Sequence, residues 1–370
     1  MTDFNEIAII GWGLMGGSLA MALRDRTDCL IYGYDSSPDV MISAQKMNLL
    51  DRPCESAKEA AAGADLVVLA TPVGAYGPIF REIHAALKPD SIITDMGSVK
   101  RPALEMAKNA GVGDRFIGGH PLAGSEKGGL EAATPYLFEN AYFFVTPASQ
   151  TLSTKTARLK TWISMLGAFP VIVSAEEHDQ IMAKTSHFPH VVASMVAVVL
   201  AEQPEQMLPA FTGSGFRDTT RIASGNPVLW EEILHLNRQE VIRCLEQMEK
   251  KSAKIREALA KKEREWIKGF LEAGKQFRDD LPKAGKDYLP AWYELYVDIR
   301  DEPGALAAIT SSLASALINI REIEILHARE GEKGAVRLAF ASSEEEQLAM
   351  KVLGSKGHSF ARSKGEKSHA

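Results

Sequence analysis

The sequence has few cysteines, no long apolar run and little clustered positive charge, and each absence excludes a class of protein. Its three cysteines, Cys29, Cys54 and Cys244, are scattered without Cys-x-x-Cys spacing, which excludes a disulfide framework and a thiolate metal site. The longest apolar stretch, residues 191–201, is far short of the roughly 20 residues that span a bilayer. A membrane-spanning protein is therefore not expected.

The net charge is −6, and no basic block occurs before the short tail after residue 355. Neither nucleic acid nor a membrane surface is therefore an expected partner. The first residues lack the basic-then-apolar pattern of a signal peptide, which predicts a cytoplasmic protein. Since one domain usually takes roughly 100–200 residues, a chain of 370 residues predicts two or three domains.

An apolar run at residues 7–10 leads directly into a Gly-x-Gly-x-x-Gly turn and an Ala/Leu-rich helix. In such a turn Gly11 permits the tight bend, Gly13 lets the backbone approach a pyrophosphate, and Gly16 lets the helix pack closely on the strand. About twenty residues on, a second apolar run ends at Asp35, whose carboxylate would accept hydrogen bonds from the adenosine ribose and repel a 2'-phosphate. The pattern predicts a dinucleotide site that prefers NAD to NADP.

Further strands are predicted at residues 65–70, 91–95, 115–118, 141–146 and 170–173, with helices between the first of them. This alternation predicts an α/β domain over residues 1–173, a Rossmann-type, doubly wound and mostly parallel sheet with its ligands at the carboxyl ends of the strands. The predicted cofactor-binding residues are Gly11, Gly13, Leu14, Met15, Gly16, Asp35, Thr71 and Pro72.

Strand signals stop near residue 174, and residues 174–280 are predicted to form an all-helical domain. Its run of alternating charges at about residues 240–268 predicts one long amphipathic helix, and its apolar stripe favours a homodimer. Residues 281–291 are predicted to be a linker. Residues 292–370 have the order βαββα with a weak final strand at 359–361 and a polar tail, which indicates a ferredoxin-like unit.

The chemistry is predicted to centre on His120, in a Gly/Pro-rich loop after the strand at 115–118. A histidine beside a nicotinamide can accept a proton from a hydroxyl while hydride leaves the same carbon. Ser98, in another loop at that sheet edge, could hydrogen-bond either the imidazole or the substrate hydroxyl. Arg221 is a candidate carboxylate clamp, with Asp218 as its partner one turn away; a plain surface ion pair is the alternative.

His178, His187 and His190 come from one helical region, so a metal site must be considered. Apart from Asp179, no suitably spaced carboxylate or cysteine accompanies them, and hydride transfer to NAD needs no metal. The histidines are therefore expected to line a polar pocket, and no metal is predicted.

A series of motifs occurs in order between about residues 5 and 275: Gly11-x-Gly13-x-x-Gly16, Asp95-x-Gly97-Ser98-Val99-Lys100, Gly118-Gly119-His120-Pro121-x-Ala123-Gly124, Glu177-His178-Asp179, Ser186-His187-x-Pro189-His190 and Gly215-Phe216-Arg217-Asp218-x-Thr220-Arg221-Ile222-Ala223. Their combination resembles the prephenate dehydrogenase family of tyrosine biosynthesis. The resemblance implies NAD-dependent oxidative decarboxylation of prephenate to 4-hydroxyphenylpyruvate.

By that resemblance, His120 would act on the C4 hydroxyl of the ring, with support from Ser98, and Arg221 would hold the ring carboxylate. His190 would line the side-chain pocket, together with Trp230 from the partner subunit. The remaining residues that it implies near the site, as substrate-binding, supporting or gating groups, are His187, Glu126, His178, Asp179 and Asp218.

The C-terminal unit resembles an ACT domain through Asp301-Glu302-Pro303-Gly304-Ala305-Leu306 and the Asn319-Ile320 step, which makes feedback inhibition by tyrosine a hypothesis. Because no helical stretch that could hold a chorismate mutase comes before residues 1–6, a fused bifunctional enzyme is not expected. Three alternatives stay open at this stage: an arogenate or dual-specificity cyclohexadienyl dehydrogenase, a β-hydroxyacid dehydrogenase with Lys184 as its catalytic lysine, and a catalytically silent sensor of NAD and an amino acid.

Overall fold

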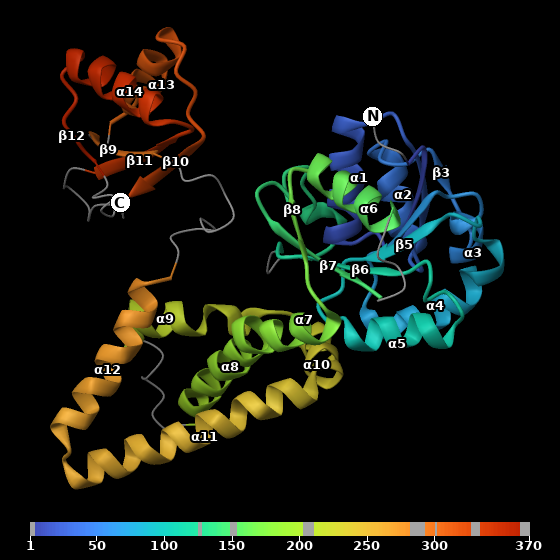
Figure 1. Ribbon diagram of the computed structural model, residues 1–370, viewed down its shortest axis with the longest axis horizontal. Coiled ribbons are helices and arrows are strands. Elements are labelled where there is room, and N and C mark those ends of the chain that lie inside the picture. Colours follow the sequence, from blue (N-terminus) through green and yellow to red (C-terminus); the bar gives the residue numbers. More distant parts are fainter. Residues whose placement is uncertain are drawn as a thin grey trace. The chain divides into compact units, whose positions relative to one another are not determined.

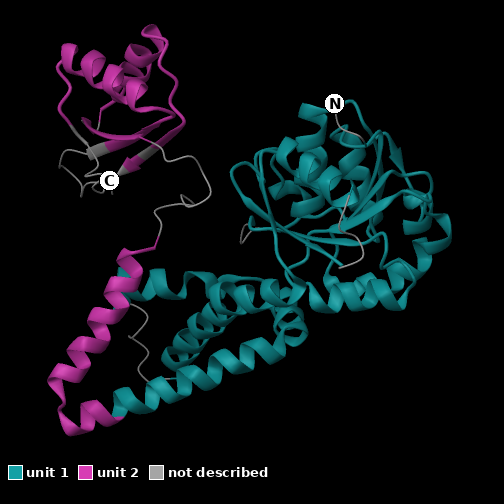
Figure 2. Ribbon diagram, viewed as in Figure 1, with its two compact units in different colours: residues 1–256 teal, residues 257–370 magenta. Residues whose placement is uncertain are grey.

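The structure, a computed structural model, describes residues 4–124, 128–148, 154–202, 211–281, 293–299, 302–326 and 334–362. The chain divides into two compact units, residues 1–256 and 257–370 (Figure 2). Within the described residues, no helix is both long enough and apolar enough to cross a membrane.

The first unit begins with a parallel sheet in the order β3-β2-β1-β4-β5, as expected for a doubly wound domain. Its two outer strands, β3 and β5, are labelled in Figure 1. Its strands are β1 (Glu6–Ile10), β2 (Leu30–Tyr34), β3 (Arg52–Pro53), β4 (Leu66–Leu69) and β5 (Ile92–Asp95). The two-residue β3 was not predicted, because it pairs with β2 over Arg52 and Pro53 alone.

Alternate residues of β1 face opposite ways, and helices cover both faces of the sheet. Ile7 and Ile9 pack in one cluster with side chains of α1 (Leu14–Arg26), α2 (Pro38–Lys46) and α6 (Thr154–Met165). Ala8 and Ile10 pack in a second cluster with side chains of the helices α3 (Ala57–Ala61), α4 (Tyr76–Ile83) and α5 (Arg101–Asn109). The loops at the carboxyl ends of the strands are left to form the site.

The later strands correct two predictions. The strands β6 (Ile117–Pro121), β7 (Tyr142–Pro147) and β8 (Phe169–Ile172) form a separate sheet, which an isolated bridge between Ile93 and Phe116 joins to β5. Antiparallel pairing with β7 extends β6 as far as Pro121, with His120 opposite Phe144. His120 therefore lies in a strand, where the sequence predicted a loop.

Residues 175–279 are helical wherever they are described, apart from short turns, which confirms the predicted change of character. The first helical stretch of this region, residues 175–202, is divided by a π turn at Ala183–His187, where Phe188 N–H donates to the Ala183 carbonyl. The wider turn lies just before Pro189, which has no N–H to donate. The helices are α7 (Ala175–Met182), α8 (Phe188–Ala201), α9 (Ser214–Thr220), α10 (Pro227–Leu236), α11 (Arg238–Lys261) and α12 (Arg264–Asp279).

The prediction of one helix over 240–268 was wrong, because α11 ends at Lys261. Lys262 adopts a left-handed conformation with φ of 55°, its N–H donates to the Leu259 carbonyl, and Glu263 N–H donates to the Ala258 carbonyl. This pair of bonds is a Schellman helix end, in which glycine usually holds the left-handed position. Because lysine holds it here, no glycine or proline marks the break in the sequence.

The C-terminal sheet has the order β10-β11-β9-β12, and each neighbouring pair is antiparallel. Its elements are β9 (Tyr293–Ile299), α13 (Ala305–Ser315), β10 (Glu322–Leu326), β11 (Gly334–Phe340), α14 (Ser343–Ser355) and β12 (Phe360–Arg362). The weak strand expected at 359–361 is thus β12, and the unit has the complete ferredoxin-like βαββαβ order. Most of the predicted linker, residues 282–291, lies outside the described residues.

Candidate functional site

A cavity of about 860 Å³ lies where the loops after β1, β4, β5 and β6 face the helical region of the same unit. Ten of the residues singled out from the sequence line it: Gly13, Leu14, Met15, Thr71, Pro72, Ser98, His120, His187, His190 and Trp230. The structure therefore brings the glycine turn, the candidate base and the helical histidines to one place.

The glycine turn has the geometry that a dinucleotide phosphate needs. Gly11 has a φ of +97°, and a Cβ on Gly16 would lie 2.0 Å from the Gly11 carbonyl oxygen, so both positions require glycine. A Cβ on Gly13, in contrast, would meet nothing within 4 Å. The N-terminus of α1 starts at Leu14 and has no acidic residue in its first turn, so its N–H groups and positive dipole end are available to an anion.

Asp35 is held at the end of β2 as a fixed acceptor. Its Oδ2 accepts a hydrogen bond from Trp12 N–H at 2.7 Å, and its Oδ1 accepts one from Ser37 N–H at 2.8 Å. Asp35 does not line the cavity itself, and it ties the glycine turn to the loop after β2. Together with the open face at Gly13, this arrangement fits the adenosine end of NAD.

Two alanine substitutions in this turn are expected to have different effects. Gly16→Ala should lower the free energy of unfolding by about 1–3 kcal/mol, because its Cβ overpacks the contact with Gly11. Gly13→Ala should leave stability unchanged and weaken NAD binding at least about tenfold, because its Cβ points into open space that the phosphates need. Thermal denaturation and NAD titration would measure the two effects; equal loss of stability in both variants would contradict this interpretation.

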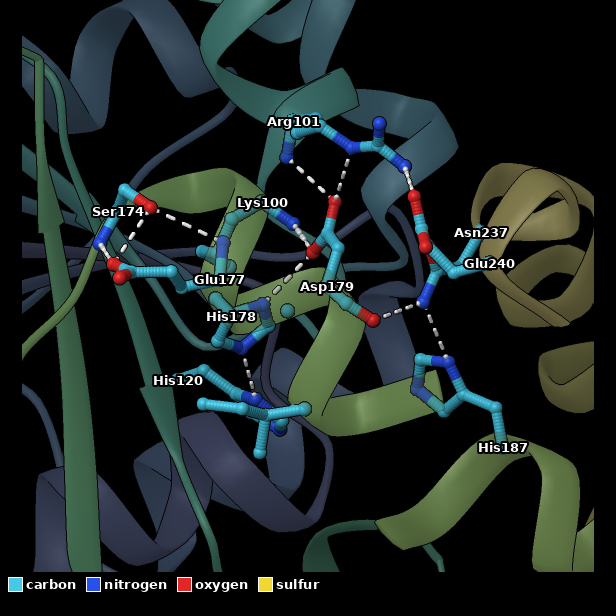
Figure 3. A network of polar contacts seen from close by, with 12 residues as sticks. Lys100, Arg101, His120, Ser174, Glu177, His178, Asp179, His187, Asn237 and Glu240 are labelled. Atoms are coloured by element: carbon cyan, nitrogen blue, oxygen red, sulfur yellow. Dashed lines mark hydrogen bonds and ion pairs between the residues drawn. The ribbon is translucent and has the colours of Figure 1, made fainter. Parts of the chain in front are cut away.

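Behind the cavity, three buried side chains form a chain of hydrogen bonds (Figure 3). His120 Nδ1 lies 2.8 Å from His178 Nε2, and His178 Nδ1 lies 2.8 Å from Asp179 Oδ1. The Asp179 carboxylate also accepts hydrogen bonds from Lys100 N–H at 2.7 Å and Arg101 N–H at 2.9 Å. These donors hold the carboxylate of Asp179, a residue of α7, against the N-terminus of α5.

This chain of contacts determines where the ring protons lie. An ionised Asp179 only accepts, so His178 Nδ1–H must donate to it, and His178 Nε2 is left as an acceptor. His120 Nδ1–H then donates to His178, which leaves His120 Nε2 with a lone pair. Because His120 lines the cavity, the arrangement presents a fixed hydrogen-bond acceptor, or general base, to a substrate hydroxyl.

The charges agree with these roles. Burial, with smaller contributions from His178 and Lys100, holds the pKa of His120 well below its usual value, so the ring is neutral. Burial alone would raise the pKa of Asp179, but hydrogen bonds from His178 and from the N–H groups of Lys100 and Arg101 lower it overall. Near neutral pH the chain therefore joins an ionised carboxylate to neutral imidazoles.

A buried ion pair that was not predicted from the sequence lies beneath this site. Lys100 Nζ contacts Asp95 Oδ2 and donates to the Gly119 carbonyl at 2.7 Å, while Asp95 Oδ1 accepts from Gly119 N–H at 2.8 Å. Asp95 Oδ2 also accepts from Gly97 N–H at 2.9 Å. The pair thus holds the residues that precede His120 and Ser98. The sequence did contain a signal for this pair, because Asp95 ends an apolar strand and Lys100 follows it five residues later.

Ser98 is half-buried and lines the same cavity as His120. Both residues are described, and no hydrogen bond joins them. Of the two contacts considered from the sequence, the one to the imidazole is therefore not formed, and the hydroxyl stays available to a ligand in the cavity.

The helical side of the cavity is built around Trp230. Its ring stacks on His190 with centroids 3.6 Å apart and an interplanar angle of 14°, and His187 contacts it edge-on at 6.2 Å. His190 Nδ1 is buried and has no hydrogen-bond partner among the described residues. The resemblance implied a tryptophan from the partner subunit, but here Trp230 of the same chain packs on His190.

Several predicted residues lie away from the cavity. Arg221 starts an exposed 3₁₀ turn at Arg221–Ser224, and although its neighbour Ile222 lines the cavity, Arg221 does not. Asp218 is exposed and forms no ion pair with Arg221, because α9 ends at Thr220 and the helical spacing between them is lost. Lys184 is exposed and does not line the cavity. Glu126 lies outside the described residues.

Among the described residues, no group of three or more His, Cys, Asp or Glu side chains is arranged to hold a metal ion. The cavity lining in the described part of the chain likewise contains no lysine or arginine. Positive charge for an anionic ligand is available at the N-terminus of α1, whose first residues line the cavity.

The buried histidines predict a loss of stability in acid. Burial lowers the pKa of His187 to about 4, whereas the unfolded chain restores the ordinary value of about 6.5. Between these values the unfolded chain binds a proton that the folded chain does not, so the free energy of unfolding falls as the pH falls from about 6.5 to about 4. At about 1.4 kcal/mol per pH unit, His187 alone accounts for about 3 kcal/mol.

Urea denaturation at a series of pH values between 7.5 and 4.5 would measure this dependence. His187→Asn should reduce the slope, whereas His84→Asn, at an exposed position, should leave it unchanged. The same slope in the wild type and in His187→Asn would contradict the prediction.

Comparison with known proteins identifies the family. Residues 19–171 match the family model described as prephenate dehydrogenase, nucleotide-binding domain, and residues 174–273 match prephenate dehydrogenase, dimerization domain. The prephenate dehydrogenase of Bacillus subtilis is 34% identical over 355 residues, which cover 94% of this chain and 95% of that protein. The cyclohexadienyl dehydrogenase of Zymomonas mobilis is 33% identical over 271 residues, 72% of this chain and 92% of that protein.

A similar solved structure is that of prephenate dehydrogenase from Aquifex aeolicus, with a TM-score of 0.71 and 32% identity over 76% of this chain and 98% of that chain. Arogenate dehydrogenase from Synechocystis has a TM-score of 0.65 and 27% identity over 74% of this chain and 99% of that chain. The family matches, together with the dinucleotide turn, show an NAD-dependent oxidoreductase. The chain belongs to the prephenate dehydrogenase family.

Proposed function

We propose that this protein oxidises prephenate with NAD, releasing carbon dioxide and 4-hydroxyphenylpyruvate. The observation that carries the proposal is the hydrogen-bonded chain from His120 through His178 to Asp179, which leaves His120 Nε2 as the acceptor, in a cavity that the glycine turn also lines. The Bacillus subtilis relative is named for the same activity, and the Aquifex aeolicus structure was solved with hydroxyphenyl propionate and NAD+.

NAD, when bound, supplies the hydride acceptor. His120 Nε2 accepts the hydrogen bond of the C4 hydroxyl and draws off its proton as the C4–H bond is broken, so that no positive charge builds up on the C4 oxygen. The C1–carboxylate bond then breaks, its electron pair makes the ring aromatic, and the proton returns to the phenol oxygen. The reaction gives one NADH and one carbon dioxide per prephenate, without net proton release.

The rest of the cavity positions the substrate. Ser98 lies in the loop that Asp95 holds and donates its hydroxyl hydrogen to the C4 oxygen. Arg221, next to Ile222 of the cavity lining, pairs with a carboxylate at C1, across the ring from C4. His187, His190 and Trp230 surround the side chain. Most of the rate enhancement then comes from orientation and from a hydrogen-bond acceptor prepared in advance.

Initial rates of NADH formation test the proposal, with prephenate and arogenate each paired with NAD and with NADP. We expect the highest kcat/KM for prephenate with NAD, and a lower value with NADP because Asp35 repels a 2'-phosphate. Activity on arogenate alone would move the function to that substrate, as for the Synechocystis relative. No activity with any of the pairs would refute the proposed function.

The low pKa of His120 predicts the pH dependence of this activity. Because burial disfavours the imidazolium, His120 stays in the active, neutral form below pH 6.5. The acid limb of log kcat/KM against pH should therefore have its midpoint below 6.5. A midpoint above 6.5, measured with saturating NAD, would show that the free enzyme's base is not a buried neutral histidine.

The helical region carries exposed apolar side chains, among them Met195 and Val198 on α8 and Val228 on α10, which are 52%, 52% and 76% exposed. With the match to a dimerization domain, they support a homodimer, which light scattering after gel filtration would test.

The ferredoxin-like C-terminal unit supports an ACT-type regulatory role with tyrosine as effector. Inhibition of the initial rate by added tyrosine would test that role.

A further inference from the structure

A second buried polar contact leads from Asp179 to the opposite side of the cavity. Asn237, which follows α10, is only 1% exposed. Its Nδ2 donates to the Asp179 backbone carbonyl at 2.8 Å and lies 3.1 Å from His187 Nδ1 (Figure 3). The Asp179 carboxylate is therefore linked to His120 through His178. The Asp179 backbone carbonyl is linked to His187 through Asn237.

These contacts fix the orientation of the amide. A carbonyl oxygen only accepts, so the group of Asn237 that faces the Asp179 carbonyl must be the NH₂ group. Its second hydrogen then points to His187 Nδ1, which must accept it. His187 is neutral, since burial lowers its pKa to about 4, and its ring proton therefore lies on Nε2.

The two cavity histidines thus have opposite hydrogen-bonding character. His120 Nε2 is an acceptor, whereas His187 Nε2–H is a donor, and both residues line the cavity. Edge-on contact with Trp230, itself stacked on His190, holds the His187 ring in place. The site therefore accepts from a hydroxyl at His120 and donates to an acceptor at His187.

Prephenate and arogenate differ at one group of the side chain on C1. Prephenate has a keto oxygen there, which accepts a hydrogen bond, whereas arogenate has an ammonium group, which only donates. We propose that Asn237 is a positioning residue that makes His187 a hydrogen-bond donor and so makes the cavity select a keto over an amino side chain. This inference rests on the proposed function, in which the C4 hydroxyl occupies the His120 end.

A carboxylate in the side-chain pocket would have the opposite effect, because it would attract the ammonium group. Glu232 lines the cavity, but its Oε1 accepts a hydrogen bond from Gly74 N–H at 2.7 Å. Gly74 follows Thr71 and Pro72 in the loop after β4, which is the predicted cofactor side. Glu232 is therefore engaged away from His187.

Asn237→Asp tests the proposal, because a carboxylate accepts from His187 Nδ1–H and so turns Nε2 into an acceptor. We expect the ratio of kcat/KM for prephenate to kcat/KM for arogenate to fall roughly 10–100-fold, mainly through the KM for prephenate. Asn237→Leu, which leaves the tautomer free, should reduce the ratio less. Asn109→Asp, the same change at an exposed position of α5, should leave it unaltered.

The ratio separates specificity from damage, because a merely structural role would lower both activities equally. A ratio unchanged in Asn237→Asp, in a wild type that prefers prephenate, would overturn this inference alone. A wild type that prefers arogenate would overturn the substrate proposal as well. If Asn237→Asp does not fold, neutron diffraction of the wild type decides: a proton on His187 Nε2 supports the proposal, and a proton on Nδ1 alone refutes it.

Discussion

Replacing His120 with alanine is expected to lower kcat for prephenate oxidation by roughly two to four orders of magnitude, the usual contribution of a general base. The variant loses the lone pair that accepts the C4 hydroxyl proton, whereas the glycine turn is untouched. NAD affinity should therefore stay within about twofold of the wild type, since no contact to the turn passes through His120.

Asp179→Asn extends this test to the residues behind His120. The amide no longer provides a charge that holds His178 and His120 in one tautomer, so kcat should fall roughly 10²-fold or more, while the rings stay in place. His84→Ala, at an exposed histidine outside the site, is the control and should retain full activity. Full activity in Asp179→Asn would show that the chain of hydrogen bonds does not set the protonation of His120.

The largest expected effect on stability comes from Lys100→Met. The Lys100 and Asp95 side chains are completely buried, and removing the ammonium leaves the Asp95 carboxylate without its counter-charge. Breaking a buried pair in this way costs about 3–5 kcal/mol in the free energy of unfolding. Since Lys100 also donates to the Gly119 carbonyl, next to His120, kcat should fall in any protein that still folds.

The double variant Asp95→Asn with Lys100→Met removes both charges and should recover part of the lost stability, because no unpaired charge remains. Lys108→Met, at an exposed position of α5, is the matched control and should unfold like the wild type. Urea denaturation measures all three. A loss below about 1 kcal/mol in Lys100→Met, the range of exposed ion pairs, would contradict a structural role for the pair.

Local signals were sufficient for much of the fold. The order βαββα with a weak final strand in residues 292–370 predicted the ferredoxin-like unit, and the glycine turn with Asp35 predicted the parallel βαβ unit. Signals failed where contacts distant in sequence decide the outcome, and where a turn position holds a residue other than the usual one. The pairing of β6 with β7 brings His120 into a strand, and a Schellman end with Lys262 in place of glycine divides α11 from α12.

The site likewise has features that the sequence predicts and features that it does not. Its loops could be found from the sequence, because they follow strands that end at one edge of the sheet. The contacts that set the protonation of its histidines could not, because Asn237 lies 50 residues from His187 and 58 from Asp179. Arg221 was predicted from its spacing, but the structure places its neighbour Ile222, and not Arg221, in the cavity lining.

The most direct test of the account is the stoichiometry of the reaction with prephenate and NAD, followed by absorbance of NADH, capture of carbon dioxide and chromatography of the product. We expect one NADH, one carbon dioxide and one 4-hydroxyphenylpyruvate per prephenate consumed, with all three lost together in His120→Ala. NADH formed without carbon dioxide, or turnover that persists in His120→Ala, would contradict it.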